Sequence, residues 1–302
     1  MSTGAAAMAR QAGPMMSRQH AAGSESARGL LFTVLGEFVL PTGGSAWTSA
    51  FIDVLGRLEV EQKATRQALM RMAAAGWLTS ERVGRRTVWQ LTPAAVRLLT
   101  EGTERIYGFT PGLVDWDGRW LLVLARAPET DRPLRHLLKT RLTWAGFGSP
   151  APGVWVSTRV DRVGEVEKVL GEAGVLDGAH VFAAEHTGHG DLAAMVAQAW
   201  DLTAVEDGYR QFLIEFADAS TSDPLARLVE LVHAWRRFPS LDPSLPDELL
   251  PEHWSGAKAA ALFRRRHASW AGRAGAEWRR LNDAAARGTT RPLRARTRTR
   301  RG

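Results

Sequence analysis

The sequence predicts an α+β protein of several domains, because the spacing of its apolar residues changes twice along the 302-residue chain. The first third combines helical periodicity with two short strand-like runs, and the middle third alternates short apolar runs with helical segments. From residue 192 onward nearly every segment has helical periodicity. We therefore expect an N-terminal winged helix-turn-helix, a central ferredoxin-like βαββαβ domain and an all-helical C-terminal domain.

Length and turn residues set the expected domain boundaries. A chain of this length is expected to form two or three domains, and Pro111-Gly112 marks the first break. The expected division is a disordered leader at 1–25, the winged helix-turn-helix at 26–110, the ferredoxin-like domain at 111–190, the helical domain at 191–284 and a basic disordered tail at 285–302.

The first domain is expected to consist of four helices and a two-stranded hairpin. Its expected elements are helices at 27–40, 47–58, 61–75 and 94–105 and strands at 77–83 and 87–91. Thr48 is expected to cap the second helix, and Thr92 followed by Pro93 to start the fourth. Gly76 closes the third helix, and Gly84-Arg85-Arg86 forms the turn of the hairpin.

The third helix separates polar and apolar residues onto two faces. At about 100° per residue, Ala64, Thr65, Ala68, Leu69 and Met72 share the face that packs inward. The opposite face carries polar side chains of the kinds that hydrogen-bond base edges in a DNA major groove. An arginine-tipped hairpin beside such a helix is suited to contacts with phosphate or a minor groove. The candidate DNA-binding residues are Gln62, Lys63, Arg66, Gln67, Arg71, Arg85 and Arg86.

The net charge of +7 does not describe the folded body. Residues 287–302 contain seven arginines and no acid, so the rest of the chain has 32 basic and 32 acidic residues. Within that neutral remainder, residues 62–91 contain six basic residues and one acid, Glu81. This local excess is the electrostatic signal that favours a nucleic-acid partner.

The middle and end of the chain supply the remaining elements. The expected order in the middle is strand, helix, two strands, helix and strand. Three of these four strands are placed, at 119–127, 154–156 and 179–184, and the two helices at 132–144 and 163–170. Gly146 and Gly148 interrupt the periodic pattern between the first helix and the strand at 154–156. The expected C-terminal helices lie at 192–202, 207–218, 224–238 and 255–281, and a proline-rich crossing at 239–251 interrupts them.

Several function classes are excluded or disfavoured by composition and motifs. The chain has no cysteine, which excludes disulfides and thiolate metal sites. No stretch approaches the about 18 consecutive apolar residues of a membrane helix, and the leader lacks the apolar region of a signal peptide; we expect a cytoplasmic protein without a membrane partner. Neither a dinucleotide-binding loop, a phosphate-binding loop nor a catalytic triad can be assigned. We therefore expect no cofactor, no metal and no catalytic residue.

Three sets of motifs carry a family resemblance. The first set is GLLFTVLGEFV at 29–39, ATRQALMRM at 64–72, GWL at 76–78, GRR at 84–86 and LTP at 91–93. The second set is WDGRW at 116–120, PE at 128–129, GFG at 146–148 and GVWVS at 153–157. The third set, which is the most specific, is LVHAWRRF at 231–238, DP at 242–243, LP at 245–246, LLP at 249–251 and Trp254.

Over positions 27 to 281 the chain resembles the PaaX family of bacterial transcriptional repressors, named for the regulator of phenylacetic acid degradation. The resemblance implies a homodimeric repressor that binds double-stranded operator DNA. It also implies a small-molecule effector that releases the protein from DNA, such as phenylacetyl-coenzyme A or another aryl- or acyl-CoA thioester. The leader and the basic tail lie outside the resemblance.

A coenzyme A thioester carries phosphates, so its site should offer arginines beside aromatic surface. The candidate effector-binding residues are Arg132, Arg135, Trp155, Arg236, Arg237 and Trp254. For any one tryptophan, packing in a core is the competing interpretation. The arginines are equally suited to ion pairs between domains.

Two other interpretations compete with a repressor. Small CRISPR-associated nucleases share the ferredoxin-like fold and hold metal with an acidic residue at the end of their first strand. The corresponding run here ends Ala125-Arg126-Ala127, which offers no carboxylate ligand and disfavours a metal-dependent nuclease or another enzyme in this domain. Separately, Glu185, His186, His189 and Asp191 have the spacing of a zinc site. Their glycine-rich setting favours solvated histidines instead.

Overall fold

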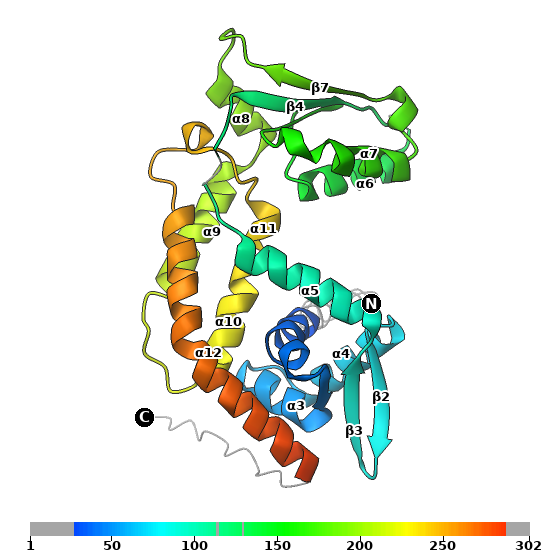
Figure 1. Cartoon of the computed structure of the whole chain (residues 1–302), viewed down its shortest axis with the longest axis vertical. Helices are drawn as coiled ribbons and strands as arrows, with labels where there is room; N and C mark the ends of the chain where they lie inside the picture. Colours follow the sequence, from blue (N-terminus) through cyan, green and yellow to red (C-terminus); the bar gives the residue numbers. More distant parts are fainter. Residues whose placement is uncertain (1–26, 113–114, 129, 288–302) are drawn as a thin grey trace, which may run out of the picture. The chain divides into compact units, whose positions relative to one another are not determined.

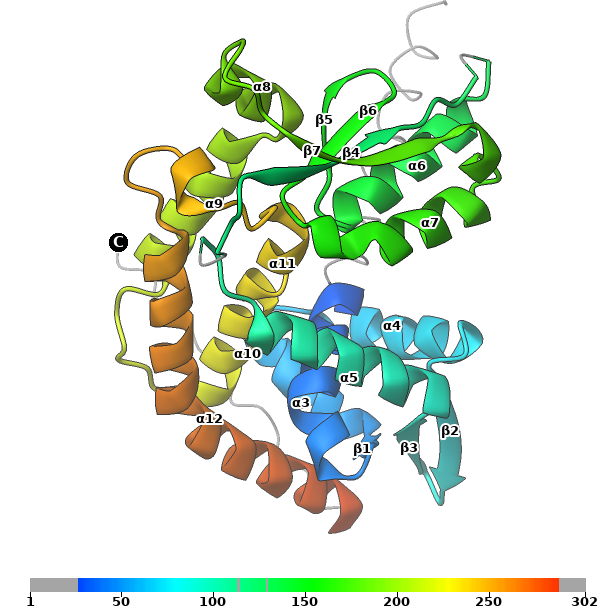
Figure 2. The same ribbon diagram turned by 45° about the horizontal axis from the view of Figure 1, so that its top comes forward.

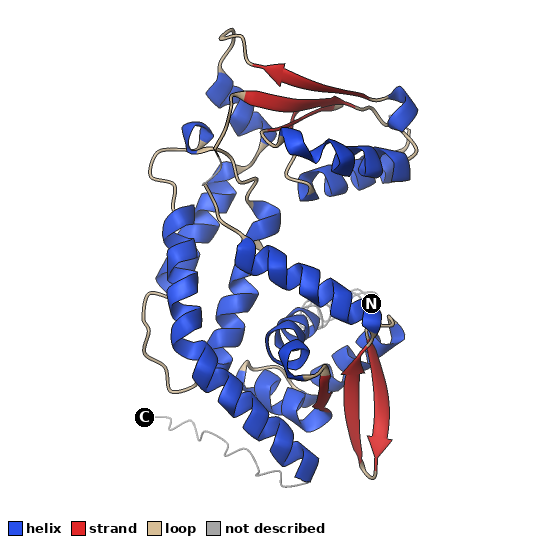
Figure 3. Cartoon of the chain, viewed as in Figure 1, coloured by secondary structure: helices blue, strands red, loops and turns tan. Residues whose placement is uncertain are grey.

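A computed structural model describes residues 27–112, 115–128 and 130–287 of the chain. The expected leader at 1–25 and residues 288–302 of the expected tail lie outside the described residues. The protein is α+β, with helices and two small antiparallel sheets (Figure 3). Its contacts divide the described chain into two compact units, which are taken separately: unit 1 contains 27–104, 220–233 and 267–287, and unit 2 contains 105–219 and 234–266.

The helices of unit 1 follow the expected order. Residues 27–34 are α-helical and continue into the π-helical η1 (Leu35–Val39) and the 3-10 helix η2 (Leu40–Thr42). The next three helices are α3 (Thr48–Arg57), α4 (Gln62–Ala74) and α5 (Pro93–Gly108). Glu59 adopts a φ of 61° in the short turn between α3 and α4, and Gly76 adopts 76° after α4. These left-handed conformations redirect the chain at each end of α4.

Of the two expected helix caps, one is confirmed and one is wrong. Thr92 Oγ1 accepts a hydrogen bond from the Ala95 amide at 3.2 Å, as expected for the residue that caps α5. The expected cap at Thr48 is wrong, because Trp47 occupies the cap position and Thr48 is the first residue of α3. The Thr48 hydroxyl instead donates to the Thr87 carbonyl at 3.0 Å and accepts from Trp89 Nε1 at 2.9 Å. It therefore joins α3 to the hairpin.

The sheet of unit 1 has one more strand than the sequence predicts. Strands β2 (Leu78–Val83) and β3 (Arg86–Leu91) form the expected hairpin, in which Val83 pairs with Arg86. The short strand β1 (Ser45–Trp47) pairs with β3 on its other side, which gives the order β1-β3-β2. Three residues are too few for a period-2 pattern to be recognised, so β1 was not expected.

Two helices from late in the sequence complete unit 1. They are residues 224–233 of α10 (Pro224–Trp235) and residues 267–287 of α12 (Gly256–Arg287). From α12 the Trp278 side chain, 1% exposed, packs on Phe38 and Phe51, with ring centroids 5.6 and 5.7 Å away. The core of unit 1 is therefore built from segments that lie more than two hundred residues apart. The helix also extends to Arg287, so residues 285–287 of the expected tail are helical.

Unit 2 contains the second sheet in the expected element order. Its strands are β4 (Arg119–Leu124), β5 (Gly148–Ala151), β6 (Val154–Ser157) and β7 (His180–Glu185), and its first helices are α6 (Arg132–Trp144) and α7 (Val163–Glu172), with the short helices η3 (Val160–Arg162) and η4 (Leu176–Gly178). The strand order is β5-β6-β4-β7, and all neighbouring strands are antiparallel. Helices α6 and α7 lie on the same face of this sheet (Figures 1 and 2).

Each face of this sheet has its own apolar cluster. Leu121 and Val123 of β4 point toward α6 and α7, where they pack with Leu138, Leu142 and Val166. On the other face, Trp120 and Val156 pack with residues of α8 (Leu192–Ala199) and with Trp200. This alternation along β4 is the period-2 pattern of a strand that is covered on both sides.

The helices after the sheet break at positions that the sequence did not indicate. The expected helix at 192–202 ends at Ala199, and α9 (Leu202–Glu215) begins three residues later, with the Asp201 carboxylate accepting from the Ala204 amide at 3.0 Å. The expected helix at 224–238 also divides, into α10 and α11 (Phe238–Leu241). Pro239 cannot donate to a preceding carbonyl, so it fits the first turn of a new helix. A 3-10 turn, η5 (Asp247–Leu249), precedes α12.

The helices were also compared with the requirements of a membrane span. In the described part of the chain, no helix combines the length and the apolar character that are needed to cross a bilayer.

A buried hydrogen bond joins α9 to the crossing that follows α11. The Tyr209 hydroxyl donates to Asp242 Oδ2 at 2.5 Å, and the Ser244 amide donates to Asp242 Oδ1 at 2.7 Å. Asp242 is 5% exposed, and burial raises the pKa of its carboxyl although both hydrogen bonds oppose that rise. Burial and the nearby carboxylates also raise the pKa of the Tyr209 hydroxyl, which stays protonated.

We expect Asp242→Asn to stabilise the protein at neutral pH relative to the wild type. A raised folded-state pKa means that the carboxyl contributes stability below its unfolded pKa of about 3.9 and loses it as the pH rises through the folded-state value. Asparagine cannot ionise. Its Oδ1 can accept from the Ser244 amide while its Nδ2 donates to the Tyr209 oxygen, so the hydrogen bond to Tyr209 is kept with its direction reversed. The free energy of unfolding of the variant should therefore exceed that of the wild type by an amount that grows with pH, about 1.4 kcal/mol for each unit of the rise.

Urea unfolding between pH 4 and 8 checks this expectation. The exposed Asp177 provides a matched control, because Asp177→Asn makes the same chemical change away from the core. A difference between Asp242→Asn and the wild type that shrinks with rising pH would contradict the assignment.

Candidate DNA-binding surface

The two faces of α4 differ in burial as the sequence predicted. Thr65, Ala68, Leu69 and Met72 are buried, and they hold the helix against the rest of unit 1. The other face is exposed to solvent and has no acidic side chain. It carries Gln62, Lys63, Arg66, Gln67, Met70 and Arg71. This exposed set contains three positive charges and two amides, so it can donate to base edges and to phosphates.

The hairpin places its two turn arginines in different environments. Arg85 is exposed at the turn, which Gly84 permits by adopting a φ of 63°. Arg86 is partly buried, and its Nη1 donates to the carbonyls of Ala285 and Ala286 at 2.5 and 2.7 Å. Of the two turn arginines, only Arg85 is therefore exposed.

Arg86 also donates hydrogen bonds to the last carbonyls of a helix. Its guanidinium lies 5.2 Å from the centre of the Trp47 ring, and it occupies the C-terminal end of α12, where unpaired carbonyls carry partial negative charge. The Trp47 amide donates in turn to Asn282 Oδ1 at 3.0 Å. Sequence reasoning missed both contacts, because partners that lie 199 to 235 positions apart leave no local pattern.

A cluster of charges fastens α3 to the late helices of unit 1. Arg57 at the end of α3 contacts Asp53 at 2.9 Å, Asp223 at 3.2 Å and Glu277 at 2.9 Å. Burial lowers the pKa of Arg57, but the hydrogen bond to Glu277 and the three carboxylate charges raise it, and the net shift is upward. Half-buried, charge-assisted hydrogen bonds of this kind fix the position of the helix that supports α4.

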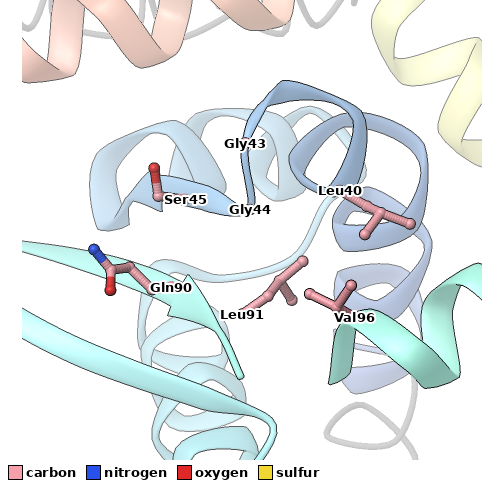
Figure 4. Close-up of a pocket in the computed structure, with 7 residues that line it drawn as sticks. All are labelled: Leu40, Gly43, Gly44, Ser45, Gln90, Leu91 and Val96. Atoms are coloured by element: carbon pink, nitrogen blue, oxygen red, sulfur yellow. The ribbon is translucent and has the colours of Figure 1, made fainter. Parts of the chain in front are cut away.

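A hollow of about 480 Å³ lies in unit 1, on the side of the domain where β1 and α5 begin. Figure 4 shows the apolar side chains of Leu40, Leu91 and Val96 converging on it, with Gln90 and Ser45 beside them. Gly43 and Gly44 complete its wall. No side chain in its lining is charged, so it is not suited to a phosphate-bearing molecule.

Family models match the three parts of the chain in sequence order. Residues 26–95 match the model of the PaaX-like protein, 113–196 match the PaaX protein central Cas2-like domain, and 200–280 match the PaaX-like protein C-terminal domain. The Escherichia coli transcriptional repressor PaaX is 32% identical over 260 residues, which cover 81% of each protein. The chain belongs to the PaaX family.

A solved structure is similar to this PaaX-family chain in fold. The uncharacterized protein Rv0674 from Mycobacterium tuberculosis gives a TM-score of 0.51 at 22% sequence identity, over 80% of this chain and 92% of that one.

The candidate effector-binding residues of this PaaX-family chain lie in several places within unit 2. Arg132 and Arg135 are exposed on α6, and Trp155 of β6 is buried in the cluster beneath that helix. Trp254 packs with the cluster on the opposite face of the sheet. Their positions on two faces do not define one pocket.

The two remaining candidates follow α10. Arg237 is exposed, with its guanidinium 5.5 Å from the centre of the Phe238 ring. Arg236 is partly buried, and burial lowers the pKa of its guanidinium.

Unit 2 of this PaaX-family chain also contains a hollow of about 570 Å³, formed by α8, the start of α9 and the segment around η5. Most of its lining is apolar, including Val196, Leu202 and Leu249. None of the six candidate effector residues lines it.

The residues considered for a metal or for nuclease chemistry do not form a metal-binding group. In the ranges 27–112, 115–128 and 130–287, no three His, Asp or Glu side chains gather closely enough to hold an ion. His186 Nδ1 accepts from the Gly188 amide at 3.2 Å, which closes a local turn. Strand β4 ends at Leu124, and the residues that follow are Ala125 to Ala127.

Proposed function

We propose that this protein is a homodimeric transcriptional repressor that binds operator DNA through α4 and the β2–β3 hairpin and is released by a small-molecule effector. The observation that carries the proposal is the exposure of the acid-free face of α4 beside an arginine-tipped hairpin. The relationship to the Escherichia coli repressor supports it. A DNA reader of this type recognises twofold half-sites as a dimer, which supports the homodimer.

The proposal assigns a fold to each part. We assign a winged helix-turn-helix to 26–110, supported by the order of α3, α4 and the hairpin. We assign a ferredoxin-like fold to 111–190, supported by the β4-α6-β5-β6-α7-β7 order and the β5-β6-β4-β7 sheet. The helical domain is assigned to 191–284.

The proposed contacts divide into two kinds. Gln62, Lys63, Arg66 and Gln67 read base edges in the major groove, where arginine pairs with guanine and glutamine with adenine. Arg71, Arg85 and Arg86 contact the phosphate backbone or the minor groove, which adds affinity without sequence preference.

The test is a selection of preferred sequences from a random duplex pool by the full-length protein, followed by affinity measurements on the selected and scrambled duplexes. We expect a partly palindromic consensus, a preference of at least about 1000-fold and a bound species that contains two chains. A protein that binds no duplex at low ionic strength, or that selects no consensus, would overturn the proposal.

For the effector we propose an aryl- or acyl-CoA thioester such as phenylacetyl-CoA. The apolar lining of the hollow beside α8 supports an aryl or acyl group. None of the six candidate effector residues lines this hollow, so the residues that hold the phosphates stay a prediction from the sequence. Phenylacetyl-CoA should raise the melting temperature and dissociate the operator complex, whereas phenylacetate and coenzyme A supplied separately should do neither.

The turn arginines offer a sharper test of the hairpin. We expect Arg85→Ala to lower the slope of log affinity against log salt by about 0.9, because one phosphate contact is lost. Arg86→Ala should reduce binding and, in addition, lower the melting temperature, since it leaves the Ala285 and Ala286 carbonyls without this donor.

Titrations of operator binding over a range of salt concentrations, with thermal unfolding of each variant, measure both effects. Arg264→Ala removes an exposed arginine in the part of α12 that belongs to unit 2 and serves as the control. An unchanged salt slope in Arg85→Ala would remove Arg85 from the proposed DNA contact.

A further inference from the structure

One large apolar side chain lies among the polar residues on the exposed face of α4. Met70 is 63% exposed, whereas Leu69 and Met72, the other large apolar residues of this helix, are at most 1% exposed. Most of the apolar surface of Met70 therefore stays in contact with water, which is unfavourable. A partner that covers this side chain would gain from removing that surface from water.

The position of Met70 aligns it with the residues that are proposed to read bases. Lys63, Arg66, Gln67 and Met70 have the spacing i, i+3, i+4 and i+7, which places their side chains on one stripe of a helix. In homeodomains a helix contacts the major groove with residues at this same spacing. The stripe is about 10 Å long at a rise of about 1.5 Å per residue. It therefore spans about three base pairs, which are stacked about 3.4 Å apart.

Met70 differs from the other three residues of the stripe in what it can recognise. Its thioether side chain has no hydrogen-bond donor, so it cannot make the contacts by which arginine and glutamine recognise purines. The apolar group that a base pair presents in the major groove is the C5-methyl group of thymine. An unbranched, polarizable side chain adapts its shape to such a group.

We propose that Met70 is a specificity-determining residue that contacts the C5-methyl group of one thymine in each operator half-site. The proposal rests on the proposed function, because α4 must itself lie in the major groove. Met70 follows Arg66 by about one helical turn, which is about 6 Å along the axis. The thymine should therefore lie within about two base pairs of the base pair that Arg66 contacts. Covering one methyl group is expected to strengthen binding about fourfold.

The experiment removes the methyl groups of the thymines one position at a time. In the selected operator each thymine is replaced by uracil, which lacks only the C5-methyl group and still pairs with adenine. Affinity is measured for the full-length wild type and for Met70→Ala, Met70→Leu and Ile214→Ala. Ile214→Ala is the matched control, because it truncates an apolar side chain of α9 that is 72% exposed. Thermal unfolding is recorded for every protein.

For the wild type we expect one thymine in each half-site at which uracil weakens binding about fourfold. Met70→Ala should bind the unmodified operator more weakly by a similar factor, and uracil at that position should cost it nothing further. Met70→Leu keeps an apolar side chain and should retain most of the sensitivity to uracil. Ile214→Ala should match the wild type on every duplex, and all four proteins should be equally folded.

Two results would overturn the inference while the proposed function stands. One is a half-site consensus that contains no thymine. The other is a set of uracil duplexes that weaken the wild type and Met70→Ala by equal factors at every position. If the wild type selects no consensus, the proposed function fails and the inference fails with it.

Discussion

Replacing Arg66 with alanine is expected to weaken binding to the operator by about 10- to 100-fold while leaving the fold intact. Arg66 is exposed near the middle of the polar face of α4, and neither a hydrogen bond nor an ion pair to another described residue involves it. A side chain of this kind is free to donate two hydrogen bonds to one guanine, which is a contact worth about 1–3 kcal/mol of discrimination. Because Thr65 and Leu69 hold the helix, removal of an exposed neighbour should not disturb packing.

The measurement is the ratio of affinities for the selected operator and its single-base variants. Arg66→Ala should lose the preference at one base pair in each half-site and keep it elsewhere. Arg264→Ala again controls for the loss of one positive charge. If Arg66→Ala lowers affinity equally on all sequences, Arg66 is a phosphate contact and the reading role passes to Gln62 or Gln67.

Periodicity predicted the buried and exposed faces of α4. The alternation of buried and exposed residues in α4 follows from one helix lying on a core, so the pattern at 62–72 was sufficient. Likewise, the alternation of Trp120, Leu121 and Leu122 between two clusters follows from a strand that is covered on both faces. In both cases the local pattern of apolar and polar residues was sufficient to predict which side chains are buried.

Periodicity could not predict contacts between segments that are distant in the sequence. The partner of Arg86 is the backbone of Ala285 and Ala286, and backbone carbonyls have no sequence signature. The same holds for Asn282, which is an ordinary polar residue until β1 brings the Trp47 amide to it. From the sequence, Arg85 and Arg86 were expected to make the same kind of contact. In the structure Arg85 is exposed, whereas Arg86 donates to backbone carbonyls of α12.

Replacing Trp278 with alanine is expected to lower the free energy of unfolding by about 3–5 kcal/mol and to abolish operator binding under conditions where the wild type is only marginally stable. Trp278 comes from the late helix α12, yet its ring packs on Phe38 and Phe51 of unit 1. The exposed Trp144, at 56%, gives the matched control, and Trp144→Ala should cost less than about 1 kcal/mol.

The two variants test whether unit 1 is one cooperative body built from three segments. If residues 267–287 are part of that body, the cavity left by Trp278 should destabilise α3 and the helix before it. A fragment limited to 26–110 should then not fold, because it lacks residues 267–287 of α12. Urea unfolding and hydrogen exchange of the α3 amides measure this directly. Equal stability of Trp278→Ala and Trp144→Ala would mean that α12 only rests on a domain that folds alone. The charge network at Arg57 and the bond from Arg86 favour the first outcome, because each fastens α3 or the hairpin to α12 at a separate point.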